Sequence, residues 1–196
     1  MLKTANNTAR VDLSSLDDDE IIIRSQKGDN AAFGELVNRY QRRVFALAYQ
    51  MTQDSEDADD LSQEAFIRAY EAIGRFQVGM KFYTWMYRIV VNLCINFQKK
   101  RSRIVNLSPE HEARIPSKRK QNPAVIIQNE ELGETIRNAL EKLPDHQKTV
   151  FALRVFQDLS YKEIADTLNI SIGTVMSRLN RAREALKSYL SGYMKL

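Results

Sequence analysis

Apolar residues spaced three and four positions apart are the feature that most restricts the fold of this chain. This spacing matches the turn of an α-helix and gives the helix one buried face. A clear example is the series Phe33, Leu36, Val37, Tyr40, Val44, Leu47, Ala48 and Met51. The pattern continues through most of the 196 residues, and only 7 glycines and 4 prolines interrupt it. Because strands joined by short loops need many such turn residues, an all-α fold is predicted.

Further helices are predicted before and after this series. Acidic residues at 17–20 precede three isoleucines, and Gly28 follows, as expected for a short helix with carboxylates at its start and glycine after its end. Asp29 or Asn30 can cap the next helix. The remaining helices are expected over residues 56–74, 83–100, 125–142, 145–157, 161–168 and 172–190.

The stretch from Ser102 to Pro123 lacks this periodicity and divides the chain. It contains three of the four prolines and the basic run 118–120. A loop of this length within one compact domain is uncommon, so the stretch is interpreted as a flexible linker between two small helical domains. The predicted parts are a loose tail over 1–16, a first domain over 17–101, a linker over 102–124 and a second domain over 125–196.

Composition argues against several classes of protein. The single cysteine, Cys94, is interpreted as a small buried hydrophobe, because one cysteine forms neither an internal disulfide nor a cysteine zinc site. His111 and His146 lie far apart, and the sequence has no glycine-rich phosphate loop or nucleophile motif. No cofactor, metal, small-molecule substrate or enzymatic activity is therefore expected. No apolar run approaches the ~18 residues of a membrane span, so a cytoplasmic protein is expected.

The second domain contains the pattern of a helix-turn-helix. Ser160 and Glu163 have the spacing of a capping box, in which each side chain bonds the backbone amide of the other residue. Residues 169–171 form a tight turn before the final helix, which Ser171 can cap. Val175 and Leu179 are expected to pack inward. A two-turn helix, a three-residue turn and a longer helix form a helix-turn-helix, which is typical of a DNA-binding module.

The opposite face of the final helix is polar and basic. Short polar groups near its start can touch base edges in a major groove, and arginines can reach guanines or phosphates. The net charge of +4 adds weak support for an anionic partner. A solvated basic helix of an ordinary bundle is the alternative. The residues predicted to contact duplex DNA are Ser171, Gly173, Thr174, Ser177, Arg178, Arg181 and Arg183.

Two segments of the first domain differ in charge. Residues 54–64 hold six acids and no base, which suits a protein-docking surface, although a solvated helix start is also consistent. Residues 76–103 instead interleave aromatic rings with cations, which can follow phosphates while exposed rings stack on unpaired bases. For Phe76, Phe82 and Tyr83, stacking and core packing are equally consistent with the sequence. Trp85 is expected in the core.

Six short motifs follow one another across both predicted domains. They are Phe33–Val37, Asp57–Tyr70, Phe82–Ile89 with Asn92, Leu143–Pro144, Leu159–Ala165 and Gly173–Arg183. In these motifs, from about residue 17 to 190, the chain resembles the extracytoplasmic-function sigma factors of bacterial RNA polymerase, of the sigma-E and sigma-W kind. The resemblance identifies the first domain with sigma region 2 and the second with sigma region 4.

The resemblance implies a subunit that directs core polymerase to promoters of a stress-type regulon. The acidic helix would dock on the clamp helices of the largest polymerase subunit, and region 4 on the flap of the β subunit. The loop and helix over 76–92 would read and melt the −10 element, with one base flipped into a pocket. The helix-turn-helix would read the −35 element through the residues predicted above. The implied polymerase contacts are Asp57, Asp60, Leu61, Gln63, Glu64 and Phe66, and the implied −10 contacts are Phe76, Lys81, Phe82, Tyr83, Thr84, Arg88 and Asn92.

The resemblance also implies an anti-sigma factor as a partner, often a membrane-anchored one, and no catalytic residue, because binding energy drives melting. Two places depart from the family pattern. The loop reads Phe76-Gln-Val-Gly-Met-Lys-Phe82, and Met176 stands where lysine or arginine is also common. The alternatives are a stand-alone helix-turn-helix regulator, which leaves the acidic helix without a role, and an adaptor that binds polymerase without promoter selectivity.

Overall fold

The computed structural model describes residues 12–107 and 130–191, and within these ranges it contains helices and no strand. This confirms the predicted all-α fold. The elements are the 3-10 turns η1 (Leu13–Ser15) and η2 (Ile73–Arg75) and the helices α1 (Asp18–Gln26), α2 (Asn30–Thr52), α3 (Ser55–Ala72), α4 (Phe82–Leu107), α5 (Glu130–Glu141), α6 (Asp145–Val155), α7 (Tyr161–Leu168) and α8 (Ile172–Leu190).

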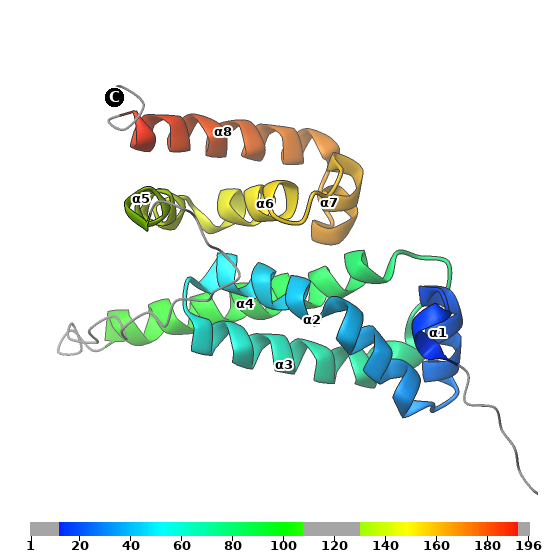
Figure 1. The fold of residues 1–196 in the computed structure, drawn as a ribbon. Helices are drawn as coiled ribbons and strands as arrows, with labels where there is room; N and C mark the ends of the chain where they lie inside the picture. The colour runs from blue at the N-terminus through cyan, green and yellow to red at the C-terminus, as the bar shows by residue number, and fades with distance from the viewer. Residues whose placement is uncertain (1–11, 108–129, 192–196) are drawn as a thin grey trace, which may run out of the picture.

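The N-terminal domain is a bundle of the three long helices α2, α3 and α4, with α1 lying across one end (Figure 1). Its apolar stripes meet in a core where Leu36, Val44 and Leu47 of α2 are completely buried. Aspartate side chains cap the starts of α1, α2 and α3. At the start of α2, Asp29 accepts hydrogen bonds from the amides of Ala31 and Ala32. Gly28, with φ +88°, provides the left-handed turn between α1 and α2 that the sequence predicts.

The C-terminal domain packs α5, α6 and α7 against the long helix α8. Leu140 and Leu143 at the end of α5 share an apolar cluster with Ala182 and Leu186 of α8. The domain forms a second layer beside the N-terminal bundle, with α7 against α4 and α6 against α2 (Figure 1). Apolar residues of both domains join one continuous cluster, so the two domains contact each other directly.

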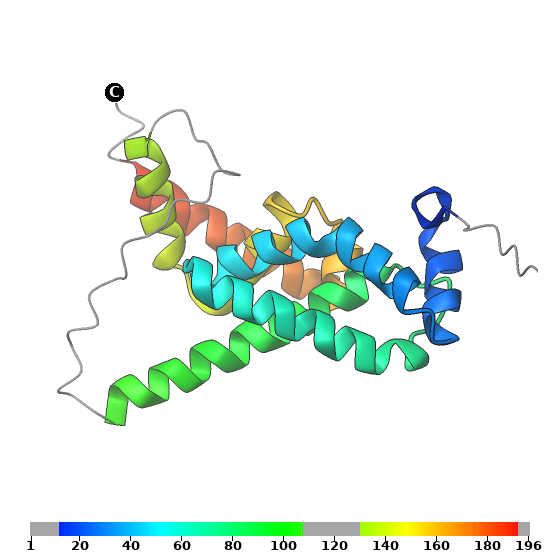
Figure 2. The same cartoon turned by 60° about the horizontal axis from the view of Figure 1, so that its bottom comes forward.

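The predicted helix boundaries hold where local capping fixes them. Helices α7 and α8 span 161–168 and 172–190 as expected. Helix α4, however, runs to Leu107, beyond the predicted end at residue 100, and projects past α2 and α3 (Figure 2). Glutamine, lysine and arginine over 98–103 give no apolar period, yet they favour helix intrinsically. The remainder of the predicted linker and residues 125–129 lie outside the described residues.

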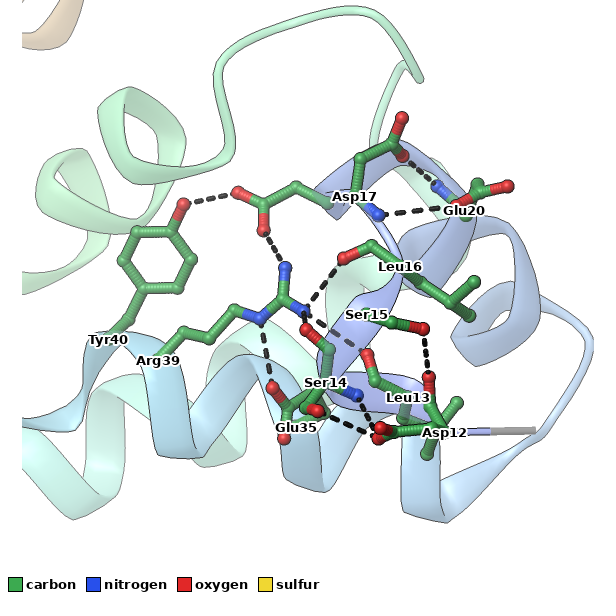
Figure 3. Close-up of polar contacts among 11 residues, drawn as sticks. Asp12, Leu13, Ser14, Ser15, Leu16, Asp17, Glu20, Glu35, Arg39 and Tyr40 are labelled. Carbon is green, nitrogen blue, oxygen red and sulfur yellow. Dashed lines mark hydrogen bonds and ion pairs between the residues drawn. The ribbon is translucent and has the colours of Figure 1, made fainter. Parts of the chain in front are cut away.

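Residues 12–16 are not the loose tail that the sequence suggested. Asp12 caps the turn η1, and the Arg39 guanidinium of α2 donates to the carbonyls of Leu13, Ser14 and Leu16 at 2.8–3.2 Å (Figure 3). Sequence patterns over a few residues cannot show this contact, because Arg39 lies 26, 25 and 23 positions away from Leu13, Ser14 and Leu16 in the chain.

The same guanidinium reaches two carboxylates. It lies 3.0 Å from both Asp18 of α1 and Glu35 of α2, and the Tyr40 hydroxyl donates a short hydrogen bond to the other oxygen of Asp18. Burial, together with the hydrogen bond to Asp18, raises the pKa of the Tyr40 phenol, which keeps it a donor. We call Arg39, Asp18, Glu35, Tyr40 and the three carbonyls the Arg39 network. It fixes η1 and α1 to the bundle.

Candidate nucleic-acid and polymerase interfaces

The helix-turn-helix of α7 and α8 has the geometry that the sequence predicts. Ser160 Oγ accepts from the Glu163 amide at 3.3 Å, and Glu163 Oε2 accepts from the Ser160 amide at 2.8 Å, which completes the capping box. Asn169 takes a left-handed conformation, φ 52°, at the end of α7. Ser171 Oγ then accepts from the Thr174 amide at 3.1 Å and caps α8. These bonds set the angle between the two helices.

One face of α8 is buried and the other is open. Val175 and Leu179 are completely buried, as predicted. The predicted duplex contacts lie on the other side: Thr174 and Arg178 are partly exposed, and Ser171, Gly173, Ser177, Arg181 and Arg183 are exposed. Figure 1 shows α8 on the side of the molecule away from the N-terminal bundle. This face is therefore accessible to a large partner.

The acidic segment forms the start of α3. Asp54 caps the helix through the amides of Glu56 and Asp57, at 2.9 and 3.0 Å. Partial burial, followed by the nearby Asp54 carboxylate, raises the pKa of Asp57, which lies 3.4 Å from Arg101 of α4. Asp60 is exposed. Carboxylates so close together form a negative surface at this end of α3.

The other predicted polymerase contacts differ in exposure. Gln63 is exposed, whereas Glu64 and Phe66 are partly exposed. Leu61 is only 8% exposed and belongs to the core, so its side chain supports the helix from within and is not part of the surface. Ile67, which was not among the predicted contacts, is 55% exposed beside these residues. The sequence could have indicated Ile67 as a surface contact, because it is an apolar residue that does not fall on the buried face of α3.

The aromatic residues around the 76–82 loop form a packed cluster. Phe76 and Phe82 are 7% and 2% exposed, and their ring centroids lie 5.1 and 5.6 Å from that of Trp85. The Tyr40 ring of α2 lies 5.1 Å from Phe82. The choice that the sequence left open is thus decided in favour of core packing for Phe76 and Phe82. Their faces are not free to stack on a base in this structure. Trp85, expected in the core, is partly buried and packs against it.

The polar residues of this segment line a cleft of about 760 Å³ between the two domains. Thr84 contributes a buried hydroxyl oxygen for which the structure gives no hydrogen-bond partner. Lys81 and Arg88 line the cleft from the N-terminal domain, and Glu163 and Asp166 line it from the C-terminal domain. Asn92 is exposed further along α4.

Polar contacts cross this cleft from α4 to α7. The Lys81 ammonium and the Tyr83 hydroxyl both donate to Glu163 Oε1. These bonds, from Lys81 first and then Tyr83 and Ser160, lower the pKa of the Glu163 carboxyl to about 2. Arg88 donates to the backbone carbonyls of Asp166 at 2.8 Å and Thr167 at 3.1 Å.

A further contact joins the two domains beside the cleft. The buried Tyr87 hydroxyl of α4 donates to Gln157 Oε1, which follows α6, at 2.8 Å. Burial raises the pKa of the Tyr87 phenol to about 12, so it remains protonated.

No metal or redox centre is found among the described residues. They contain no group of three or more histidine, cysteine or acidic side chains that could hold a metal ion. Cys94 is completely buried, as predicted, and burial raises the pKa of its thiol to about 12. His111 lies outside the described ranges. Within those ranges, none of the helices combines the length and apolar character that crossing a membrane requires.

Comparison with known proteins identifies the family. Residues 36–104 match the family model for Sigma-70 region 2, and residues 133–186 match that for Sigma-70, region 4. The chain is 34% identical to the RNA polymerase sigma-H factor of Pseudomonas aeruginosa, over 93% of this chain and 98% of that one. The chain belongs to the extracytoplasmic-function sigma factors. It is a transcription initiation factor, not an enzyme and not a stand-alone regulator.

Other relatives place this sigma factor within the same group. It is 37% identical to the ECF RNA polymerase sigma factor SigW of Bacillus subtilis, over 86% of this chain and 94% of that one. It is 38% identical to the ECF RNA polymerase sigma-E factor of Escherichia coli, over 87% and 93%. The N-terminal domain thus contains region 2, matched over residues 36–104, and the C-terminal domain contains region 4, matched over residues 133–186.

Solved structures share the fold of this sigma factor. CnrH in complex with the cytosolic domain of CnrY has a TM-score of 0.68 at 23% identity, covering 89% of this chain and 97% of that one. The sigma factor RpoE in complex with the anti-sigma factor NepR, from Bartonella quintana, has a TM-score of 0.65 at 25% identity, covering 81% and 96%.

Proposed function

We propose that this sigma factor binds core polymerase through α3, reads the −35 element with α8, and reads and melts the −10 element with the 76–81 loop and α4. The observation that carries the proposal is the two-sided α8. Its apolar side is locked onto the domain by Val175 and Leu179, and its polar and basic side is exposed. A helix presented in this way at the end of a helix-turn-helix fits a major groove.

Within α8, two kinds of contact are expected. The amides and hydroxyls at its start, at Ser171, Gly173, Thr174 and Ser177, suit base edges and phosphate oxygens. The arginines 178, 181 and 183 add long cationic side chains that reach guanines or the backbone. Met176, 48% exposed, adds an apolar contact at a position where lysine or arginine is also common in the family. Specificity would come from the first group together with Arg178.

The surface of α3 is proposed to bind core polymerase at the clamp helices of the largest subunit. Carboxylates at Asp57, Asp60 and Glu64 make this surface unsuitable for DNA and complementary to a basic protein surface. Gln63 and Phe66 would contribute contacts between the charges, and the exposed Ile67 would supply an apolar anchor. Region 4 would contact the flap of the β subunit.

For the −10 element, the proposal retains Lys81, Tyr83, Thr84, Arg88 and Asn92 as contacts. Phe76 and Phe82 would act by holding the loop in shape from the core. Lysine and arginine attract the phosphates of the melted strand, and the loop supplies a pocket for one flipped base. Contacts with the extruded base offset the cost of unstacking it, so no catalytic group is required.

Regulation by an anti-sigma factor is part of the proposal. CnrH and RpoE share the fold, and the RpoE structure is a complex with an anti-sigma factor. We expect this protein to act in the cytoplasm and to be held inactive there, or at the inner membrane, by such a partner.

Run-off transcription with bacterial core polymerase on a random promoter library tests the proposal. We expect enrichment of a two-part promoter with a fixed spacer. On the enriched promoter, Arg178→Ala should reduce initiation about tenfold, as the loss of one base or phosphate contact predicts. Arg42→Ala, on the exposed side of α2, is the matched control and should leave initiation unchanged. Initiation that does not depend on the library sequence would overturn the proposal.

A further inference from the structure

We propose that the free protein is closed by its own region 4: α7 covers the −10-reading surface of α4 while α8 stays open to duplex DNA. This inference rests on the proposed function, because it concerns the residues that we assign to the −10 element. The contacts of Lys81, Tyr83 and Arg88 with α7, and of Tyr87 with Gln157, are called the α4–α7 interface below.

The same side chains serve two partners. Three of the five retained −10 residues, Lys81, Tyr83 and Arg88, are bound to α7 in this structure. A fourth, Thr84, lines the cleft between the helices. A melted strand needs these groups for its phosphates and bases, so it and α7 exclude each other.

The chemistry of α7 resembles that of the ligand it would exclude. Glu163 offers a carboxylate to Lys81, in the position that a phosphate oxygen would take. Arg88 binds the carbonyls of Asp166 and Thr167, which lie at the end of α7. The last carbonyls of a helix lack partners within it and carry partial negative charge, so they favour a cation. Lys81, which directly precedes α4, and Arg88 of α4 thus bind near opposite ends of α7.

The −35-reading face takes no part in this closure. Ser177, Arg181 and Arg183 are exposed, and α8 packs mainly on α5, α6 and α7. The closed protein can therefore meet duplex DNA through α8 before the −10 surface is uncovered. This predicts an order of events, with duplex contact first and strand capture after α7 has left α4.

The α4–α7 interface is also suited to being opened. The Lys81 side chain is 62% exposed, so its ion pair with Glu163 is accessible to competing phosphates and to salt. Phosphates of a nucleic acid strand release counterions when cations bind them, which favours the exchange of partners.

A spin-label distance measurement on the full chain tests whether the closed form exists. Nitroxides at Glu71→Cys on α3 and Ser188→Cys on α8 report the separation of the two domains, and the buried Cys94 should not react. We expect one narrow distance distribution in this background. Glu163→Gln combined with Gln157→Ala should broaden it toward longer distances, because glutamine retains the capping box but not the charge. The proposal would be overturned by a broad distance distribution in the background protein. It would also be overturned if the double variant did not broaden the distribution.

The matched control is Glu134→Gln combined with Asn138→Ala. Both residues are exposed on α5, and the pair removes one charge and one amide from region 4 without touching the α4–α7 interface. It should leave the distance distribution narrow.

Covering of the −10 surface is tested by binding of a fluorescein-labelled, mixed-sequence single-stranded 12-mer. The Glu163→Gln, Gln157→Ala variant should bind about threefold to fivefold more tightly than the parent, the range that losing exposed polar contacts allows. Binding of a mixed-sequence duplex should not change, since α8 is exposed in both forms. Equal single-strand affinities would overturn the proposal.

The two proposals fail in different ways. If the promoter library yields no enriched promoter, the proposed function fails whatever the spin labels report. If promoters are enriched but the variant and its parent bind the single strand equally, the covering role of α7 fails and the sigma function stands.

Discussion

The Arg39 network and the α4–α7 interface use the same chemistry at different depths. In both, lysine or arginine side chains of region 2 bind a carboxylate and backbone carbonyls that belong to another segment. Arg39 is 24% exposed and bridges Asp18, Glu35 and three carbonyls inside region 2. Lys81 is 62% exposed and joins region 2 to region 4. We therefore expect burial, more than the type of bond, to make the Arg39 network a lasting link and the α4–α7 interface one that can be released.

The largest expected effect is the loss of the Arg39 network. Arg39→Met keeps the aliphatic stem but leaves Asp18, Glu35 and the carbonyls of η1 without their donor. We expect a loss of about 2 kcal/mol in the free energy of unfolding, because groups left unpaired in a partly buried site keep their desolvation cost. Urea denaturation measures it. Arg42→Ala, at an exposed position of α2, should change stability by less than ~0.5 kcal/mol. Equal effects of the two substitutions would show that Arg39 is no more than a surface residue.

A smaller loss is expected from Tyr40→Phe. The substitution removes only the hydroxyl that donates to Asp18, and the ring keeps its contact with Phe82. A loss of about 1 kcal/mol is expected from one such bond. In combination with Arg39→Met the cost should be less than additive, since both residues bind the same carboxylate. Full additivity in urea denaturation would argue against a shared network.

How far the sequence predicts these features depends on the distance between the partners. The capping box of Ser160 and Glu163 involves neighbours, so α7 was predicted to the residue. The second oxygen of Glu163 binds Lys81 and Tyr83, 80 or more positions away, and no local pattern indicates that contact. The sequence therefore predicted the contact of Glu163 with Ser160 but not its contacts with Lys81 and Tyr83.

The aromatic loop shows the same limit. Phenylalanine beside a basic loop suits base stacking and core packing alike, and the sequence left both open. The decision comes from Tyr40 and Trp85, whose rings cover Phe82 and Phe76 once the helices have packed. The N-terminal turn was missed for a related reason, because its donor lies on α2. Helix types and caps were predictable, whereas the partners of polar groups across helices were not.

Salt should distinguish the two networks. Raising NaCl from about 0.1 M to about 1 M shortens the screening length from ~10 Å to ~3 Å. We expect the spin-label distances of the Glu71→Cys, Ser188→Cys protein to broaden, because the Lys81 and Glu163 charges lie near solvent. The Arg39→Met stability loss should persist at the higher salt. If the distance distribution does not change with salt, the α4–α7 interface is as lasting as the Arg39 network.

The smallest expected effect is a pH dependence of closure. Hydrogen bonds from Lys81 and Tyr83, the two largest causes, and from Ser160 lower the pKa of Glu163 from 4.5 to about 2. A carboxylate with a lowered pKa favours the closed form fully above about pH 4.5 and loses this contribution as the pH falls toward 2. The bonds from Ser160 lie within region 4 and survive opening, so only the part of the pKa shift due to Lys81 and Tyr83 drives the change.

Among the groups that face Glu163, the pKa of Lys81 and that of Tyr83 are both raised, so neither loses its proton in this pH range. The spin-label distances should therefore lengthen as the pH falls from about 4.5 toward 2, with circular dichroism confirming that the helices persist. Glu163→Gln retains every other carboxylate of the chain, including Asp166 in the cleft, and should give a flatter profile. Identical pH profiles for the parent protein and the Glu163→Gln variant would mean that other carboxylates cause the titration. The charge of Glu163 would then contribute nothing to closure.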